Sequence, residues 1–228
     1  MTCRSILAGL LLLLPAGIAQ AMSSLPANPG ICEQAGAEAE RGFGIPPGLL
    51  LAIGRVESGR WDAARRRIVP WPWSVGTPTA GNYLDSKDDA IAAVRRMQAG
   101  GASNIDVGCF QINLGHHPKA FQDLEQAFDP FANARYAAGF LATLQARLGN
   151  WNGAIESYHS ADLSRGIPYR RLVQASWTAS PETTAPGSDQ PYLRFGIRIW
   201  TPSGTMGGGN VGVSPAVAGL PRIIVPGR

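Results

Sequence analysis

Apolar side chains recur at helical spacing between Ile31 and about Ala175. The clearest example follows Asp129-Pro130, a typical helix start with Asp at the N-cap and Pro in the first turn. The apolar positions beyond it follow the helical period: Phe131, Ala134, Ala138, Leu141, Leu144 and Leu148. The same kind of pattern predicts helices over residues 31–42, 46–57, 86–100, 118–127, 129–148 and 150–159. We therefore predict a mainly α-helical domain over residues 31–176.

Two segments depart from this pattern. Residues 61–85 are irregular and rich in Trp, Pro, Gly and Thr, and leave room for a short hairpin. In residues 181–228, 16 of 48 positions are Gly or Pro, which predicts a disordered, flexible tail. Within that tail, residues 192–200 alternate apolar and polar side chains, as a strand does. This segment is either a partner-binding strand or a strand that packs on the parent domain.

The first 21 residues have the features of a secretory signal peptide. Arg4 gives a positive start, an apolar run over residues 6–14 follows, and Ala19-Gln20-Ala21 is a typical cleavage signature. The apolar run is too short for a membrane span. We therefore expect an exported protein, cleaved after Ala21.

Three cysteines and a modest positive charge narrow the picture further. Cys3 lies in the expected signal peptide, which leaves Cys32 and Cys109 as a pair for which a disulfide is the default in an oxidising compartment. The net charge of +4 suits an anionic polymer or surface but decides nothing alone. His116-His117 lack a third ligand at metal spacing, so no metal site is predicted. We expect no cofactor and no nucleic-acid partner.

Glu57 is the leading candidate for chemistry. It closes the apolar run of residues 45–57, in which Pro46 and Pro47 fit a first helical turn. Apolar surroundings and the negative end of the helix dipole both disfavour its ionised form. A carboxylic acid that stays neutral near pH 7 is what a general acid requires. The alternative is a solvated glutamate at a helix end.

Three further segments join Glu57-Ser58 in a recognisable order. Residues 108–113 read GCFQIN, residues 128–139 open a long helix after Asp-Pro, and residues 154–160 read AIESYHS. Together they resemble the soluble lytic transglycosylase domain of the goose-lysozyme-like superfamily. That family has Glu-Ser, then Gly-Leu-Met-Gln-Ile-Asn, a helix after Asp-Pro, and Ala-Tyr-Asn. The resemblance covers residues 31–176 and implies a lysozyme-like fold, peptidoglycan as substrate and the periplasm as location.

The resemblance also implies a mechanism with one carboxylate. Glu57 protonates the leaving glycosidic oxygen, and the N-acetyl group of the substrate supplies the second group that other glycosidases provide. The 6-hydroxyl of N-acetylmuramic acid then attacks the anomeric carbon, and Glu57 removes its proton. The expected product is a 1,6-anhydromuramoyl end. Asp106, two residues before Gly108, offers the alternative of hydrolysis if it positions a water on the opposite sugar face.

Four other residues match family positions. Ser58 would hydrogen-bond near the acid or near the substrate N-acetyl group. Gln111 and Asn113 would bind sugar amides and hydroxyls, with turn-making amides as the alternative. The Tyr158 hydroxyl would reach the Glu57 carboxyl, unless it is simply a half-buried aromatic.

The departures from the family pattern bring further candidates. Cys109-Phe110 replaces Leu-Met, and Cys109 would bond to Cys32 and tie the first helix to the wall of the active site. His159 replaces the family Asn and either contacts substrate or is a surface or capping histidine.

Two further groups lie in the irregular segment. Trp71 and Trp73 either stack on sugar faces or pack over the domain. Residues 65–67 are three arginines that either attract cell-wall carboxylates or are simply solvated.

Two rival functions stay open at this point. One is a cell-wall cysteine peptidase with Cys109 as nucleophile and His159 as base. The other is a non-enzymatic module that binds glycan and recruits partners. For the enzyme we expect a monomer that opens the wall for an envelope-spanning machine, with the tail docking to a flagellar rod or secretion-system protein.

Overall fold

The computed structural model describes residue 28 and residues 30–78 and 80–178. The expected signal peptide at residues 1–21, the tail at 181–228 and its strand at 192–200 lie outside the described residues. Within the described part, no helix combines the length and apolar character that a membrane span requires.

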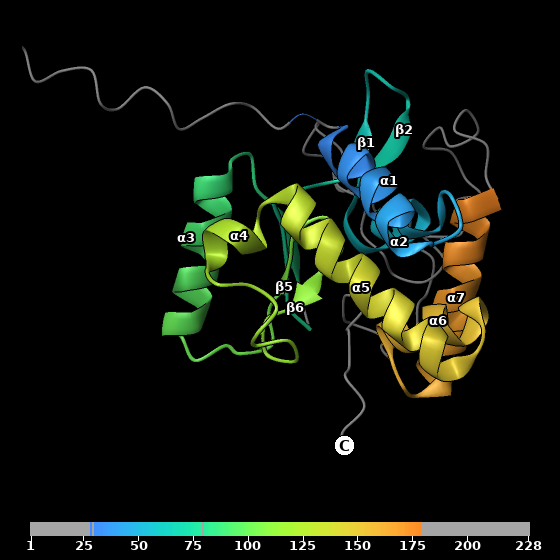
Figure 1. Cartoon of the computed structure of the whole chain (residues 1–228). Helices are drawn as coiled ribbons and strands as arrows, with labels where there is room; N and C mark the ends of the chain where they lie inside the picture. Colours follow the sequence, from blue (N-terminus) through green and yellow to red (C-terminus); the bar gives the residue numbers. More distant parts are fainter. Residues whose placement is uncertain (1–27, 29, 79, 179–228) are drawn as a thin grey trace, which may run out of the picture.

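Helices make up most of the described chain (Figure 1). They are α1 (Ile31–Phe43), α2 (Leu49–Ser58), α3 (Lys87–Ala99), α4 (Leu124–Ala127), α5 (Pro130–Leu148), α6 (Trp151–His159) and α7 (Leu163–Thr178). Long α5 crosses the molecule, with α3 and α4 at one end and α6 and α7 at the other (Figure 1). Contacts of α5 with α1 and α6, and of α7 with α2 and α6, assemble the helical part. The predicted mainly α fold is confirmed.

The helix boundaries show where sequence patterns were insufficient. The helix predicted over 118–127 is wrong for its first six residues, because α4 begins only after Asp123, whose side chain accepts a hydrogen bond from Gln126 N. Helix α7 was not among the predicted helices. It contains Pro168, and a proline inside a helical pattern normally indicates a break.

Helix α2 begins three residues later than predicted because a distant carboxylate caps it. Residues 46–48 form a turn, and Gly48 takes a positive φ of 82°. The buried Glu40 side chain on α1 accepts hydrogen bonds from Gly48 N (2.8 Å), Leu50 N (2.8 Å) and Leu51 N (3.2 Å). These are amides that a helix start leaves without partners. The cap therefore comes from α1, and the anion also suits the positive end of the α2 dipole.

The segment predicted as irregular contains more strand than expected. Strands β1 (Gly59–Asp62) and β2 (Arg67–Pro70) form an antiparallel hairpin. A second sheet has the order β4-β3-β5-β6, with all neighbours antiparallel. Its strands are β3 (Ser74–Gly76), β4 (Gly81–Tyr83), β5 (Asp106–Val107) and β6 (Ile112–Asn113).

Two hydrophobic clusters place these parts relative to each other. The larger one lies among the helices and includes Ile53, Phe110, Leu141 and Tyr158. The smaller one lies between the four-stranded sheet and α3 and includes Val75, Ile91, Val94 and Val107. Phe110 and Ile112 belong to the larger cluster although they follow β5, so the turn between β5 and β6 reaches into the helical part, toward the end of α2.

Candidate active site

The Glu57 carboxyl is buried at the C-terminal end of α2, with 3% of the residue exposed. Its Oε1 accepts a hydrogen bond of 2.6 Å from the Tyr169 hydroxyl on α7. Its Oε2 is buried and has no hydrogen-bond partner among the described residues. A buried polar atom without a partner is costly, and such atoms are often kept for a catalytic role.

Burial raises the pKa of Glu57 well above its usual value. The Tyr169 hydroxyl acts in the opposite direction because it donates to the carboxylate, while the nearby charge of Asp106 raises the pKa further. Desolvation is the largest of these effects, so burial favours the neutral, proton-bearing form of the carboxyl. The direction agrees with the sequence-based expectation that apolar surroundings disfavour the ionised form.

Tyr169 is a site residue that the sequence analysis missed. It lies on α7, directly after Pro168, and its ring stacks on the His159 imidazole with 4.6 Å between ring centroids and 13° between planes. Burial lowers the pKa of His159 to about 4, so this imidazole is neutral near pH 7. His159 therefore supports Tyr169, which in turn holds Glu57.

The predicted contact between the Tyr158 hydroxyl and the Glu57 carboxyl is wrong, because the hydroxyl has a different partner. The Tyr158 hydroxyl donates to the Phe110 carbonyl at 2.9 Å, and its ring is fully buried. Tyr158 still lies close enough to Glu57 for that carboxyl's charge to raise the Tyr158 pKa. Tyr158 thus holds the turn at Phe110, which forms a wall of the site. The hydrogen bond to Glu57 that was predicted for Tyr158 comes from Tyr169 instead.

The Ser58 side chain holds two segments together. Its hydroxyl donates to the Cys109 carbonyl at 2.6 Å and accepts from Trp71 N at 3.1 Å. It is fully buried, so the predicted hydrogen bond to the acid or to a sugar is corrected to a structural one. Through Ser58, the end of α2 is joined to the turn that carries residues 108–111.

Gln111 lies in that turn with a strained backbone. Its φ is +48°, a conformation that non-glycine residues adopt rarely and at an energetic cost. The side-chain Nε2 donates to the carbonyls of Ser74 (3.2 Å) and Gly108 (3.0 Å). Oε1 is buried and unpartnered within the described chain. Gln111 is thus partly a turn-forming amide, and its role in substrate binding stays a prediction.

Asn113 is fully engaged within the protein. Its Oδ1 accepts from Gly115 N (3.0 Å) and His116 N (2.9 Å), and its Nδ2 donates to Asn104 and to Asp106 Oδ1 (2.7 Å). The expectation that Asn113 binds sugar is therefore corrected, because both of its polar atoms already have protein partners.

A second missed residue, Asn133 on α5, fixes the turn from the other side. Its Oδ1 accepts from Phe110 N (3.0 Å), and its Nδ2 donates to the carbonyls of Val107 and Ala127 (both 3.1 Å). A β-carbon at Gly108 would lie 2.5 Å from Asn133 Nδ2, and Gly108 has a φ of +81°. Glycine is therefore required there by conformation and by space.

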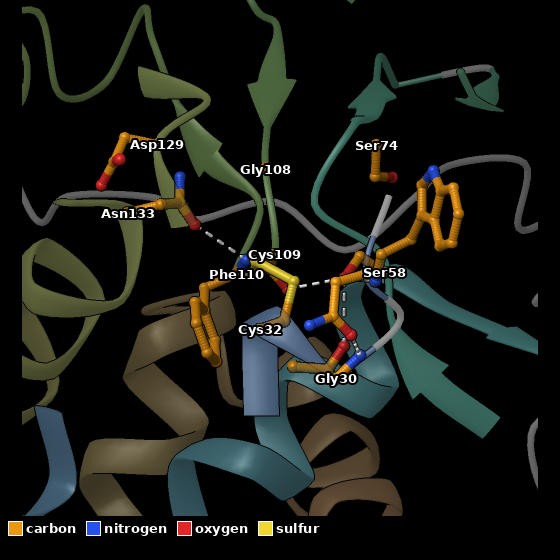
Figure 2. The surroundings of a disulfide bond; sticks show 12 residues. Gly30, Cys32, Ser58, Ser74, Gly108, Cys109, Phe110, Asp129 and Asn133 are labelled. Atoms are coloured by element: carbon orange, nitrogen blue, oxygen red, sulfur yellow. Dashed lines mark hydrogen bonds between the residues drawn. A yellow bond between two sulfur atoms is a disulfide. The ribbon is translucent and has the colours of Figure 1, made fainter. Parts of the chain in front are cut away.

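The predicted disulfide between Cys32 and Cys109 is confirmed. Figure 2 shows it joining α1 to the turn at residues 108–110, beside the hydrogen bond from Phe110 to Asn133. Because Cys109 is bonded and fully buried, it is not a free nucleophile. This geometry argues against the cysteine peptidase.

The two candidate tryptophans, Trp71 and Trp73, differ in how deeply they are buried. Trp71 is buried, donates from Nε1 to the Leu84 carbonyl (2.7 Å), and carries the Arg60 guanidinium 4.1 Å above its ring. Trp71 therefore packs over the domain. Trp73 is half-buried, with its ring edge-on to Trp71 at 6.0 Å, and its stacking on sugar stays a prediction.

In the arginine run, Arg65 pairs with Asp62 and Arg67 pairs with Glu33, which leaves Arg66 exposed between two engaged neighbours. The described residues contain no cluster of three or more His, Cys, Asp or Glu that could hold a metal. His117 is buried and its Nδ1 lies 2.7 Å from the Tyr136 hydroxyl.

A family model described as "Transglycosylase SLT domain" matches residues 34–165, which is more than half of the chain. The match includes Glu57, the turn at 108–113 and Tyr158, and it ends before Tyr169. No curated protein and no solved structure shows a significant match.

Proposed function

Because the chain belongs to the transglycosylase SLT domain family, whose fold is lysozyme-like, we propose that it cleaves the β-1,4 bond between N-acetylmuramic acid and N-acetylglucosamine in peptidoglycan. The family indicates lytic transglycosylase chemistry on this polymer. The observation that carries the proposal is the buried Glu57 carboxyl, with one oxygen held by Tyr169 and the other without a partner in the described chain.

Glu57 is the acid and then the base. Its proton passes to the leaving glycosidic oxygen, and the bond from that oxygen to the anomeric carbon breaks. The 6-hydroxyl of the muramoyl residue attacks the anomeric carbon, and its proton returns to Glu57. The product is a 1,6-anhydromuramoyl end. Desolvation keeps Glu57 in the neutral, proton-bearing form that the first step requires, and it favours the return of the proton to Glu57 in the second step.

The cellular setting is part of the same proposal. The sequence of residues 1–21 favours export to the periplasm, where the enzyme acts as a monomer on intact glycan strands. Local opening of the wall for an envelope-spanning apparatus, with the tail at 181–228 as the docking element, fits a small exported enzyme of this family. Removal of residues 181–228 is expected to spare wall cleavage in vitro and to disturb assembly or localisation in the cell.

Digestion of purified peptidoglycan followed by mass spectrometry of the muropeptides tests the reaction. Anhydro products are lighter by one water than hydrolysed products. Wild type is expected to release anhydro ends, and products with the mass of hydrolysis would contradict the transglycosylase step.

The Glu57→Gln variant separates the enzyme from a non-enzymatic glycan-binding module. Glutamine keeps the size of the side chain and cannot donate the proton, so turnover is expected to fall by 10³-fold or more while glycan pull-down persists. Surface-exposed Asp88→Asn on α3 serves as a charge-matched control that keeps turnover. Unchanged biological activity of Glu57→Gln in the cell would favour the binding module.

A further inference from the structure

An open groove of about 570 Å³ lies along α5 and is not used by the proposed mechanism. Its lining comes from three parts of the chain: α5, the end of α1 at Phe43, and Phe121 in the segment before α4. On α5, the lining residues Arg135, Gly139 and Thr143 follow each other at intervals of four residues, about one helical turn. At about 1.5 Å per residue, the groove follows α5 for about 12 Å, which is the length of about three extended residues. The groove therefore has the length of a short peptide.

Packed rings connect this groove to the helix end that carries the acid. The ring of Phe140, which lines the groove, lies on the Tyr158 ring with 5.6 Å between ring centroids. The Tyr158 hydroxyl donates to the Phe110 carbonyl, and the Phe110 ring lies against Gly54 on α2, where an added β-carbon would be 2.9 Å from it. Gly54 precedes Glu57 by about one turn of the same helix. The groove and the acid therefore lie within the reach of one polymer strand.

Most polar side chains of the groove are engaged within the protein. The Tyr136 hydroxyl lies 2.7 Å from His117 Nδ1, and the Thr143 hydroxyl donates to the Gly139 carbonyl at 2.8 Å. The Gln126 Oε1 accepts from a backbone amide at 2.7 Å. The rest of the lining, apart from one arginine, is apolar or aromatic. A sugar ring would find few hydrogen-bond partners here, whereas methyl groups fit such a surface.

Arg135 is the charged side chain of the groove. It is exposed, and no hydrogen bond or ion pair joins it to another described residue. By contrast, Arg65, Arg67 and Arg170 pair with carboxylates of the protein. The planar guanidinium offers a fork of donors that matches a carboxylate. A ligand that fits this groove therefore combines apolar groups with a carboxylate.

We propose that the groove binds the stem peptide of peptidoglycan, with a peptide carboxylate on Arg135 and alanine methyl groups against Phe43 and Phe140. The inference rests on the proposed function, because the choice of ligand follows from the substrate. Muramoyl residues carry short peptides with methyl groups and free carboxylates, whereas N-acetylglucosamine carries no charge. Phe43 is available for this contact because 41% of it is exposed. Arg135 thus makes the enzyme select strands that carry peptides over bare glycan.

The Arg135→Gln variant tests this selection on two substrates. One is purified glycan strands with their stem peptides, and the other is the same strands after an amidase has removed the peptides, which leaves the lactyl carboxylate in place. On peptide-bearing strands we expect kcat/KM to fall about 10-fold, the effect of one charge-assisted hydrogen bond. The loss is expected mainly in KM, because the contact holds substrate and transition state alike. On stripped strands the variant is expected to match wild type within about two-fold.

Arg147→Gln is the matched control, because Arg147 is also an exposed arginine of α5 but does not line the groove. It makes the same change in charge on the same helix and is expected to alter neither substrate by more than about two-fold. Both arginines are exposed, so we expect both variants to keep the wild-type melting temperature.

A binding measurement that needs no catalysis completes the test. The free stem tetrapeptide is titrated into protein labelled with nitrogen-15, and the amide signals of Gly139 and Thr143 are followed by NMR. They are expected to shift in wild type and in Arg147→Gln, and to stay in place in Arg135→Gln.

An Arg135→Gln variant with wild-type kcat/KM on peptide-bearing strands would overturn the inference. Equal losses on both kinds of strand would overturn it as well, because they would assign Arg135 to the lactyl carboxylate. The absence of shifts in wild type would show that the groove binds no peptide. A wild type that binds the tetrapeptide but cleaves neither strand would overturn the proposed function and leave the peptide site supported.

Discussion

Removal of the Cys32–Cys109 disulfide is expected to cost more stability than any other single change near the site. The bond closes a loop over a sequence separation of 77 residues. In the chain-entropy model, a loop of this length stabilises the folded protein by about 4.5 kcal/mol, because the crosslink restricts the unfolded chain. For a domain of this size, that corresponds to a fall in melting temperature of roughly 9–18 °C.

The measurement is urea unfolding of the Cys32→Ala/Cys109→Ala double variant beside wild type, followed by tryptophan fluorescence at pH 7. Reduced and alkylated wild type is the control that keeps both residues. A loss below about 1 kcal/mol would refute the reasoning. At 20 °C the double variant is expected to keep glycan cleavage, whereas a cysteine peptidase would lose all activity with Cys109.

Three further outcomes follow from the contacts around the site. Tyr169→Phe removes the hydroxyl that favours ionised Glu57, so the alkaline limb of kcat/KM is expected to move to higher pH; a limb at the wild-type pH contradicts this. Gly108→Ala should lower the free energy of unfolding in urea by about 2 kcal/mol or more, because it combines a positive φ with a clash against Asn133. Gly101→Ala, which has a positive φ but open space around the new β-carbon, should lower it by about 1 kcal/mol. Equal losses in the two variants would show that the clash contributes nothing. Glu57→Gln should raise the melting temperature more at pH 8 than at pH 4. The folded-state pKa of Glu57 lies above its unfolded value, so wild type loses stability as pH rises between the two, and a gain independent of pH would contradict the raised pKa.

The burial of Glu57 could be predicted from the sequence because its setting is local. Apolar residues at helical spacing determine which face of α2 is buried, and with it the burial of the last turn, where Glu57 lies. The disulfide followed from counting cysteines outside the expected signal peptide. The exact start of α2 could not be predicted, because its cap is the Glu40 carboxylate of another helix.

The partners of the acid depend on contacts between distant segments. Tyr169 lies 112 residues after Glu57, in a helix that contains a proline, and no local pattern connects the two. The sequence motif directed attention to Tyr158 because it occupies the family position, yet its hydroxyl binds the Phe110 carbonyl.

The amides of the 108–113 turn show a similar limit. Residue type and spacing mark Gln111 and Asn113 as candidate site residues, but an amide near a sugar site can have either of two roles. One is direct binding of substrate, and the other is support of the protein. The hydrogen bonds of Asn113 to Gly115, His116 and Asp106 assign it to support. Only the folded turn distinguishes these roles.

The protonation state of Glu57 is the most direct test of the whole account. Side-chain carboxyl carbons can be followed by NMR in protein labelled with carbon-13 glutamate, and the Glu57 signal is the one that disappears in Glu57→Gln. We predict that this carboxyl keeps its proton to a clearly higher pH than the exposed glutamates do. A Glu57 signal that titrates together with those exposed glutamates would contradict it.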